Sequence, residues 1–133
     1  MDQQAKDVVI ECTKASDEER ITFAEVVKAL MQVGVERYHA DLLRAERTYY
    51  MPGGDSERVM GHAIKSEPAK PFSGSGVQAA VHAIQGGQIQ YREFCERVAA
   101  AGCVGYIVSM AGRRAVYYGR TGETHVEMFP GAK

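Results

Sequence analysis

Residues 21–50 read ITFAEVVKALMQVGVERYHADLLRAERTYY, and residues 89–118 read IQYREFCERVAAAGCVGYIVSMAGRRAVYY. The two stretches align without a gap at one constant offset, which the glycines define (102 − 34 = 68). Identical residues at this offset are Ile21 and Ile89, Glu25 and Glu93, Gly34 and Gly102, Tyr38 and Tyr106, Tyr49 and Tyr117, and Tyr50 and Tyr118. An internal repeat informs the fold before any single motif does. We therefore interpret the chain as a tandem duplication of one structural unit.

The first unit is predicted to contain two helices followed by three strands. Apolar residues at helical spacing favour a short helix over residues 3–16. Thr22 and Glu25 form a capping-box pattern that starts the second helix. Gly34 is expected to end that helix, because glycine takes the left-handed conformation at no steric cost. Three strands are expected next, at residues 35–43, 47–51 and 57–64.

The second unit is predicted to repeat this order. A capping-box pattern at residues 75–78 starts its first helix, and Gly86 and Gly87 end it. The second helix runs from Tyr91 toward Gly102. Strands are expected at residues 104–110, 116–119 and 124–129.

These elements predict an α+β fold. Strands that follow one another through short turns pair in the antiparallel sense. We expect one antiparallel sheet of about six strands, with four helices over one face and a pseudo-two-fold axis that relates the units. The chain is interpreted as a single domain, residues 1–133, in which the pseudo-repeats 3–64 and 75–130 are joined by the linker 65–74.

Composition limits the classes of function. The 133 residues are 45% hydrophobic, which suits one domain with a core, and the net charge of −1 provides no field that attracts nucleic acid or an anionic membrane. No apolar run approaches the roughly 20 residues of a membrane helix. The polar, acidic start MDQQAKDVVIE is not a secretory signal, which predicts a cytoplasmic protein. Cys12, Cys95 and Cys103 are expected to be reduced and buried.

Several segments resemble a family of small bacterial proteins. They are VERYHADL at residues 35–42, an Arg-x-x-Tyr-Tyr hairpin, VQAAVHAIQGGQIQY at residues 77–91 and GETHVEMFP at residues 122–130. The family is one of unknown function, and some of its members carry the label "phage envelope protein". The resemblance covers nearly the whole chain. It implies a bacterial protein, of prophage origin where the label applies, and no particular reaction.

Two histidine–carboxylate pairs are the candidates for chemistry. His39 and Asp41 stand two apart on a predicted strand and so share a face, and neither residue is repeated in the second unit. His125 and Glu127 have the same spacing near the end of the chain. If the two strands are neighbours, both pairs join in one cluster.

This cluster, with Arg37 and Glu123 added, has two possible uses. Imidazole and carboxylate groups can bind Zn²⁺ or another transition metal, or His39, Asp41 and His125 can act as catalytic acid–base groups. The alternative is a solvated strand face, which commonly carries such residues. Whether a metal binds is left open. No cofactor is predicted, because no phosphate- or dinucleotide-binding motif is present.

Tyrosines and arginines supply two further predictions. The repeated tyrosines are interpreted as core rings with hydroxyls at the edge of the core, and the alternative is an aromatic-lined groove along the pseudo-axis. Candidate ligand-binding residues are Arg37, Tyr38, Tyr106, Glu123 and Glu127. The arginines near the predicted hairpin turns are interpreted as exposed turn residues rather than phosphate-binding groups; they are Arg44, Arg47, Arg113, Arg114 and Arg120.

Two hypotheses of function follow. The favoured one is a non-catalytic binding or interaction module whose partner is another protein or a second copy of itself, joined through an exposed sheet edge. The alternative is a small enzyme or metal-dependent ligand binder that uses His39, Asp41 and His125. Whether the protein is an enzyme is left open by these patterns.

Overall fold

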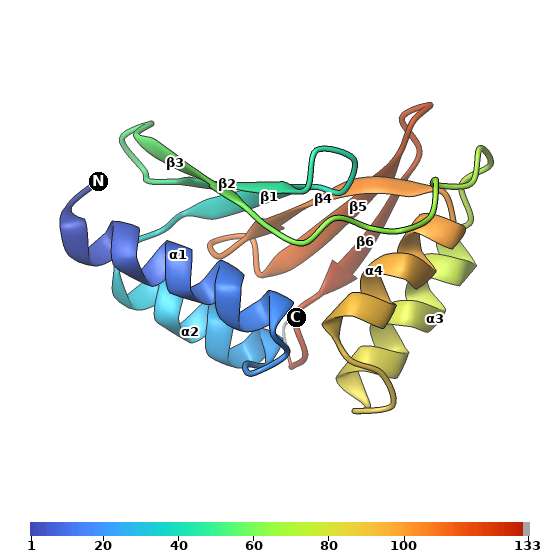
Figure 1. Cartoon of the computed structure of the whole chain (residues 1–133), viewed down its shortest axis with the longest axis horizontal. Helices are drawn as coiled ribbons and strands as arrows, with labels where there is room; N and C mark the ends of the chain where they lie inside the picture. Colours follow the sequence, from blue (N-terminus) through green and yellow to red (C-terminus); the bar gives the residue numbers. More distant parts are fainter. Residues whose placement is uncertain (132–133) are drawn as a thin grey trace.

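A six-stranded antiparallel sheet carries four helices on one of its faces in the computed structural model, which describes residues 1–131 (Figure 1). The elements are α1 (Gln3–Asp17), α2 (Phe23–Gln32), β1 (Arg37–Asp41), β2 (Glu46–Tyr50), β3 (Ser56–Met60), α3 (Gly74–Gln85), α4 (Tyr91–Ala100), β4 (Cys103–Ser109), β5 (Arg114–Gly119) and β6 (Thr124–Met128). This arrangement confirms the predicted α+β class. We call the face of the sheet opposite the helices the open face.

The strand order is β3-β2-β1-β4-β5-β6, so β1 and β4 meet at the centre and β3 and β6 are the edges. In the antiparallel central pair, His39 stands opposite Ile107, its own equivalent at the 68-residue offset. Arg37 faces Ser109 and Asp41 faces Gly105 in the same symmetric way. The register is therefore symmetric about the His39–Ile107 pair, as a pseudo-two-fold axis requires. Tandem duplication and self-association through an edge strand stay predictions.

Helix starts in the two units follow local sequence rules with one difference. Thr22 Oγ1 accepts from the Glu25 amide at 3.3 Å, and Glu25 Oε1 accepts from the Thr22 amide at 2.9 Å, which confirms the first capping box. The capping box predicted at Ser75 is wrong, because Ser73 is the N-cap of α3. The Ser73 amide donates to Ala101 O at 2.7 Å, and this contact holds the end of the linker so that the helix begins at the next residue.

The third strand ends earlier than the predicted residue 64. β3 stops at Met60, and the chain leaves the sheet after Gly61, whose amide still follows the β2–β3 register, because the His62 amide binds outside the strand pairing. Gly61 N–H donates to Ala45 O at 2.7 Å, and His62 N–H donates to Asp17 Oδ2 at 2.9 Å. The chain is thereby drawn toward the end of α1.

The linker 65–74 lies against the second unit. Ala69 N–H donates to Ala99 O at 2.9 Å, at the end of α4. Phe72 packs on Gly119, where a β-carbon would come within 2.9 Å of the phenyl ring. These contacts anchor the linker, whereas the interpretation of residues 1–133 as one domain stays a prediction.

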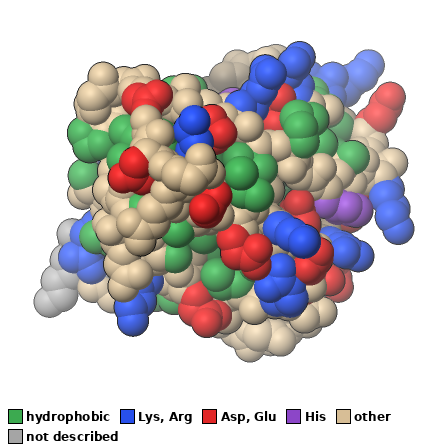
Figure 2. All heavy atoms as spheres, turned by 60° about the vertical axis from the view of Figure 1, so that its left-hand side comes forward, with side chains coloured by type: hydrophobic (Ala, Val, Ile, Leu, Met, Phe, Trp, Pro, Cys, Tyr) green, Lys and Arg blue, Asp and Glu red, His purple; other side chains and the backbone are tan. Residues whose placement is uncertain are grey.

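The surface carries charges of both signs. Figure 2 shows Lys and Arg side chains interspersed with Asp and Glu on the face that it presents. No helix among residues 1–131 is long and apolar enough to cross a bilayer.

Candidate ligand-binding cavity

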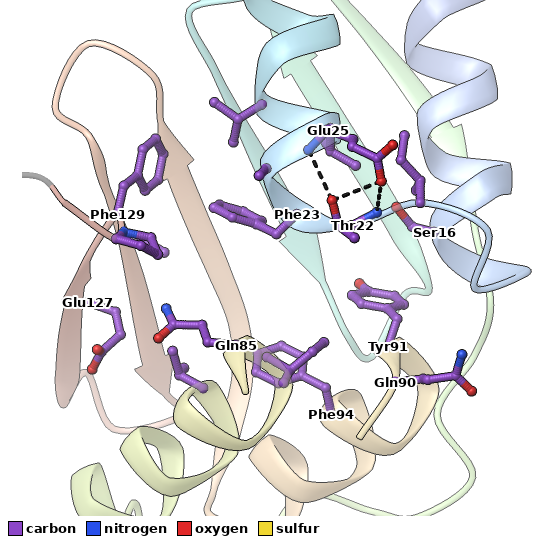
Figure 3. Close-up of a pocket in the computed structure, with 18 of the residues that line it drawn as sticks. Ser16, Thr22, Phe23, Glu25, Gln85, Gln90, Tyr91, Phe94, Glu127 and Phe129 are labelled. Carbon is purple, nitrogen blue, oxygen red and sulfur yellow. Dashed lines mark hydrogen bonds between the residues drawn. The ribbon is translucent and has the colours of Figure 1, made fainter. Parts of the chain in front are cut away.

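The two helix pairs stand apart on the sheet, and a cavity of about 840 Å³ lies between them. α1 packs on α2 and α3 packs on α4, whereas the pairs touch one another through α1 and α4. The first turn of α2, the end of α3, the start of α4 and the segment after β6 form the walls, which Figure 3 shows. Small-molecule sites span roughly 300–1,000 Å³, so this cavity has the size of a ligand site.

Phe23 and Phe129 are in contact at the opening of the cavity. Phe23 begins α2, and Phe129 follows β6; Figure 3 shows their rings facing one another. The ring centroids are 5.3 Å apart in an edge-to-face arrangement. Phe23 keeps 42% of its surface exposed, which leaves apolar surface that a ligand can cover.

Tyrosines form the floor of the cavity. Tyr38 and Tyr106, which are equivalent residues of the two units, lie on the central strands with ring centroids 6.4 Å apart. Tyr117 continues the row at 5.2 Å from Tyr106. The Tyr91 hydroxyl, from α4, lies 2.9 Å from the Tyr106 hydroxyl. The rings are thus buried as predicted for core tyrosines, and the cavity opens above them as in the alternative of an aromatic groove.

Arg47 is a buried cation on the same floor. Only 6% of its surface is exposed, and its Cζ lies 4.8 Å from the centroid of the Tyr91 ring, a cation–π contact. Asp17 Oδ1 is 3.9 Å from Arg47 Nη2, which is longer than a hydrogen bond.

The expectation that Arg47 is an exposed turn residue is wrong. β2 begins at Glu46, and the alternation of the strand turns Arg47 toward the helices together with Tyr49. The remaining arginines of that group are exposed as predicted; they are Arg44, Arg113, Arg114 and Arg120. The sequence signal for burial was the position of Arg47 two residues before Tyr49, which places both side chains on the same face of the strand. Arginine, however, is a surface residue in most proteins.

The two units differ at the position of Arg47. At the 68-residue offset, the equivalent of Arg47 is Ala115. Ala115 also points toward the helices, from β5, and lines the cavity. A methyl group therefore stands where the first unit has a long side chain. The smaller side chain leaves open space on the second unit's side of the cavity. The substitution of Ala115 for Arg47 is already visible when the two copies are aligned.

Burial controls the protonation of the cavity tyrosines. Desolvation is the largest effect on the pKa of Tyr106 and of Tyr91 and raises both, while the guanidinium of Arg47 acts in the opposite direction. These phenols are therefore protonated at neutral pH, and each can donate a hydrogen bond.

Two buried thiols predict a loss of stability at alkaline pH. Burial is the main cause that raises the pKa of Cys95 and of Cys103 from 9.0 to about 11. Because folding raises these pKa values, their contribution to stability is complete below pH 9 and is lost as the pH rises toward 11. We expect the free energy of unfolding, measured with urea, to fall over this range by about 1.4 kcal/mol per pH unit for each thiol. Cys95→Ala should remove part of the slope, and a stability independent of pH would contradict the prediction.

The predicted histidine cluster is not formed. β1 and β6 are separated by β4 and β5. His39 lies on the open face, whereas His125 stands opposite Tyr117, whose ring is buried beneath the helices. Residues directly opposite one another share a face of the sheet, so the two histidines lie on opposite faces. The prediction that His39, Asp41 and His125 share one site is therefore wrong, because it required the first and last strands to be neighbours.

Each member of the first pair has local partners. His39 Nε2 lies 2.7 Å from the Tyr118 hydroxyl on the open face. Asp41 Oδ1 accepts from the amides of Leu43 and Arg44, both at 3.0 Å. Asp41 thus stabilises the turn between β1 and β2, a common use of aspartate.

The second pair lies at the wall of the cavity. Glu127 lines it; its Oε2 lies 2.6 Å from His125 Nε2, and its Oε1 lies 3.5 Å from Nε2 of His82 on α3. Arg37, on the open face, and Glu123, in the turn before β6, are not among its lining residues. The candidate ligand-binding residues that do line the cavity are Tyr38, Tyr106 and Glu127.

Metal ligation finds no geometric support in residues 1–131. Within that range, no group of three or more His, Cys, Asp or Glu side chains is arranged to hold a metal ion. The three cysteines are free and buried, as predicted, and they lie on three different elements, α1, α4 and β4. The chemistry of the cavity is instead that of one buried guanidinium, several phenols and an apolar wall.

Comparison with known proteins supports a family of unknown function. A search of curated proteins found no match to this chain. Residues 64–127 match the family described as Protein of unknown function (DUF1398). The matched segment spans α3, α4, β4 and β5 and most of β6, so it covers the second unit of the fold. The second half of this chain is therefore similar to a protein family whose function is unknown, and the bacterial and phage labels stay predictions from the resemblance.

Proposed function

We propose that this protein is a non-catalytic binding module that holds a small organic molecule between its helix pairs. The observation that carries the proposal is the cavity of about 840 Å³ above the tyrosine floor. The cavity opens to solvent, so its apolar walls are in contact with water, which is unfavourable in free energy. A ligand that fills the space removes this apolar surface from water.

The lining of the cavity has the composition of a small-molecule site. Its walls are mainly apolar, with Val26 from α2, Ile84 from α3 and Phe94 from α4 among them. A few polar groups converge on the floor, where Arg47 lies beside the Tyr91 ring. Apolar walls supply affinity, and a small number of polar groups fix the orientation of the ligand.

Binding without catalysis is proposed because the acid–base groups at the walls are engaged in the fold. Glu25 closes the capping box with Thr22, and Glu127 Oε2 lies 2.6 Å from His125 Nε2. A general base must reach a substrate proton at hydrogen-bond distance with its lone pair available. One oxygen of each carboxylate is thus held by a partner within the protein.

A cavity-filling substitution tests the proposal. N-phenyl-1-naphthylamine, an uncharged apolar dye that fluoresces when it leaves water, is the probe. Wild-type protein is expected to bind one dye per chain, and Ala115→Phe is expected to weaken binding at least about tenfold, because the phenyl ring takes the space above β5. Titration of dye fluorescence measures both affinities.

The matched control is Val116→Phe, the next residue of β5, whose side chain points to the open face. It adds the same ring to the other side of the sheet and is expected to leave dye affinity unchanged. Circular dichroism confirms that both variants are folded. Equal dye affinity in wild type and Ala115→Phe, or no dye binding by the wild type, would refute a ligand site in this cavity.

A further inference from the structure

We infer that the ligand of this cavity is an amphipathic carboxylate, whose anionic head binds Arg47 and whose apolar body extends toward Phe23 and Phe129. The inference rests on the proposed binding function and adds the chemical class of the ligand. It starts from one observation: a guanidinium more than nine-tenths buried faces the cavity, and its carboxylate neighbour is beyond hydrogen-bond distance.

The charge of Arg47 is incompletely compensated within the fold. Asp17 Oδ1 is 3.9 Å from Nη2, and the other oxygen, Oδ2, accepts from the His62 amide at 2.9 Å. Among residues 1–131, Asp17 is the only carboxylate within 4.0 Å of the guanidinium. A buried charge is unfavourable unless it is paired and hydrogen-bonded. An anion in the cavity supplies the pairing that the protein leaves incomplete.

The other charged groups that line the cavity also have partners in the fold, and all of them except Glu19 have one within 3.0 Å. They are Arg20 with Glu18 (2.7 Å) and Glu11 (3.0 Å), Glu25 with the Thr22 amide (2.9 Å), Glu127 with His125 (2.6 Å), and Glu19 with Arg92 (4.0 Å). Of the two lining arginines, Arg20 is exposed and already bound to two carboxylates. Arg47 is therefore the cation that a ligand anion would select.

The surroundings of Arg47 suit a carboxylate. The Tyr91 ring under the guanidinium restricts its position, and planar guanidinium groups bind planar carboxylates through two parallel N–H donors. The hydroxyls of Tyr91 and Tyr106 lie 2.9 Å apart, so this pair can offer a further O–H donor to the head group. Burial strengthens each of these electrostatic contacts relative to water.

The position of the apolar body follows from the rest of the lining. From the floor at Arg47, the walls of α2 and α3 lead to the exposed ring of Phe23 and its neighbour Phe129. An apolar chain laid along this path covers Phe23, while the head remains at the floor. A medium-chain fatty acid is the simplest molecule with this distribution of charge.

Competition against bound N-phenyl-1-naphthylamine tests the head group with wild-type protein alone. The competitors are octanoate, 1-octanol and octylammonium, which share one chain and differ in charge. Octanoate is expected to displace the dye at a concentration at least about tenfold lower than 1-octanol, because it gains the charged contact with Arg47. Octylammonium is expected to be the weakest, because it places a second cation beside the first.

Two substitutions assign the preference to Arg47. Arg47→Met keeps an apolar side chain of similar length and is expected to remove the advantage of octanoate over 1-octanol, with each competitor measured against the affinity of the dye for that variant. Arg47→Lys keeps the charge and is expected to retain part of the advantage. Should Arg47→Met fail to fold, Arg47→Lys and the wild-type competition still decide the question.

The possible failures are distinguishable. If the dye binds, Ala115→Phe abolishes its binding, and 1-octanol competes as well as octanoate, the carboxylate inference is overturned and the binding function stands. If octanoate is preferred but Arg47→Met keeps that preference in full, the assignment to Arg47 is overturned. If the dye does not bind wild-type protein, the binding function itself is overturned.

Discussion

Gly102→Ala is expected to lower the free energy of unfolding by more than about 3 kcal/mol, whereas Gly34→Ala, at the equivalent position of the first unit, is expected to lower it by only about 1 kcal/mol. Both glycines follow the second helix of their unit with positive φ, +87° for Gly102 and +82° for Gly34, so both replacements incur the same backbone strain. What differs is the space around the added β-carbon.

At Gly102, a β-carbon would overlap Pro71 O and come within 2.8 Å of Phe72 Cα, both backbone atoms of the linker. At Gly34, its nearest neighbour is Met51 Cε at 3.5 Å, an ordinary contact with a flexible side chain. Backbone atoms cannot move aside without displacing the linker, so the loss at Gly102 is expected to exceed about 3 kcal/mol.

Urea denaturation followed by circular dichroism measures this difference. The Gly34→Ala variant serves as the matched control for left-handed strain. Equal losses of stability at the two glycines would show that the linker does not press on Gly102, contrary to the packing described above.

Tyr49→Ala is expected to lower the free energy of unfolding by about 3–5 kcal/mol, the second large effect. Tyr49 is the largest fully buried side chain, with 0% of its surface exposed. Its ring lies 5.2 Å from that of Tyr38, and its hydroxyl lies 2.7 Å from Thr13 Oγ1 on α1. Removal of the ring leaves a cavity in the core and separates β2 from the helix that covers it.

The Tyr49 hydroxyl is the donor in its contact with Thr13. Thr13 Oγ1 already uses its single proton to donate to Val9 O at 3.0 Å, so the tyrosine must donate to Thr13. Tyr49→Phe keeps the ring and loses the hydroxyl with its contacts to Thr13 and to the Arg47 guanidinium, and we expect a loss of about 1–2 kcal/mol.

Tyr50→Ala is the positional control for Tyr49→Ala. Tyr50 is the next residue on β2, lies on the open face and stacks under Arg37 at 4.2 Å. Its removal is expected to cost about 1 kcal/mol. Losses of similar size for Tyr49→Ala and Tyr50→Ala would contradict the assignment of the helix-covered face as the core.

Much of the fold could be predicted from the repeat and from periodicity. The two-fold recurrence of helix, helix and three strands was predicted with small errors of boundary, and the capping box at Thr22 and the left-handed Gly34 were predicted by residue. The spacing of two residues correctly placed His39 and Asp41 on the same face of β1. These features depend on residues that are near one another in the chain.

The candidate site could be predicted only in part. Tyr38 and Tyr106 were identified as the lining of an alternative groove, whereas the cluster of His39 with His125 required a strand pairing that the sheet does not make. Arg47 was missed because its charge predicts exposure and its place in the alternation predicts burial. In the structure, the Tyr91 ring on α4 makes a cation–π contact with Arg47, and this contact offsets part of the cost of burying the charge.

By itself, the sequence determined the order of the elements, the shared face of His39 and Asp41 on β1 and the equivalence of Gly34 with Gly102. Tertiary structure alone decided that β1 pairs with β4, that the linker passes over only one of those two glycines, and that the helix pairs leave a cavity beside Arg47. The physical reason is that capping and periodicity are properties of neighbouring residues. Strand partners, close backbone contacts and empty volume arise where segments distant in the chain meet.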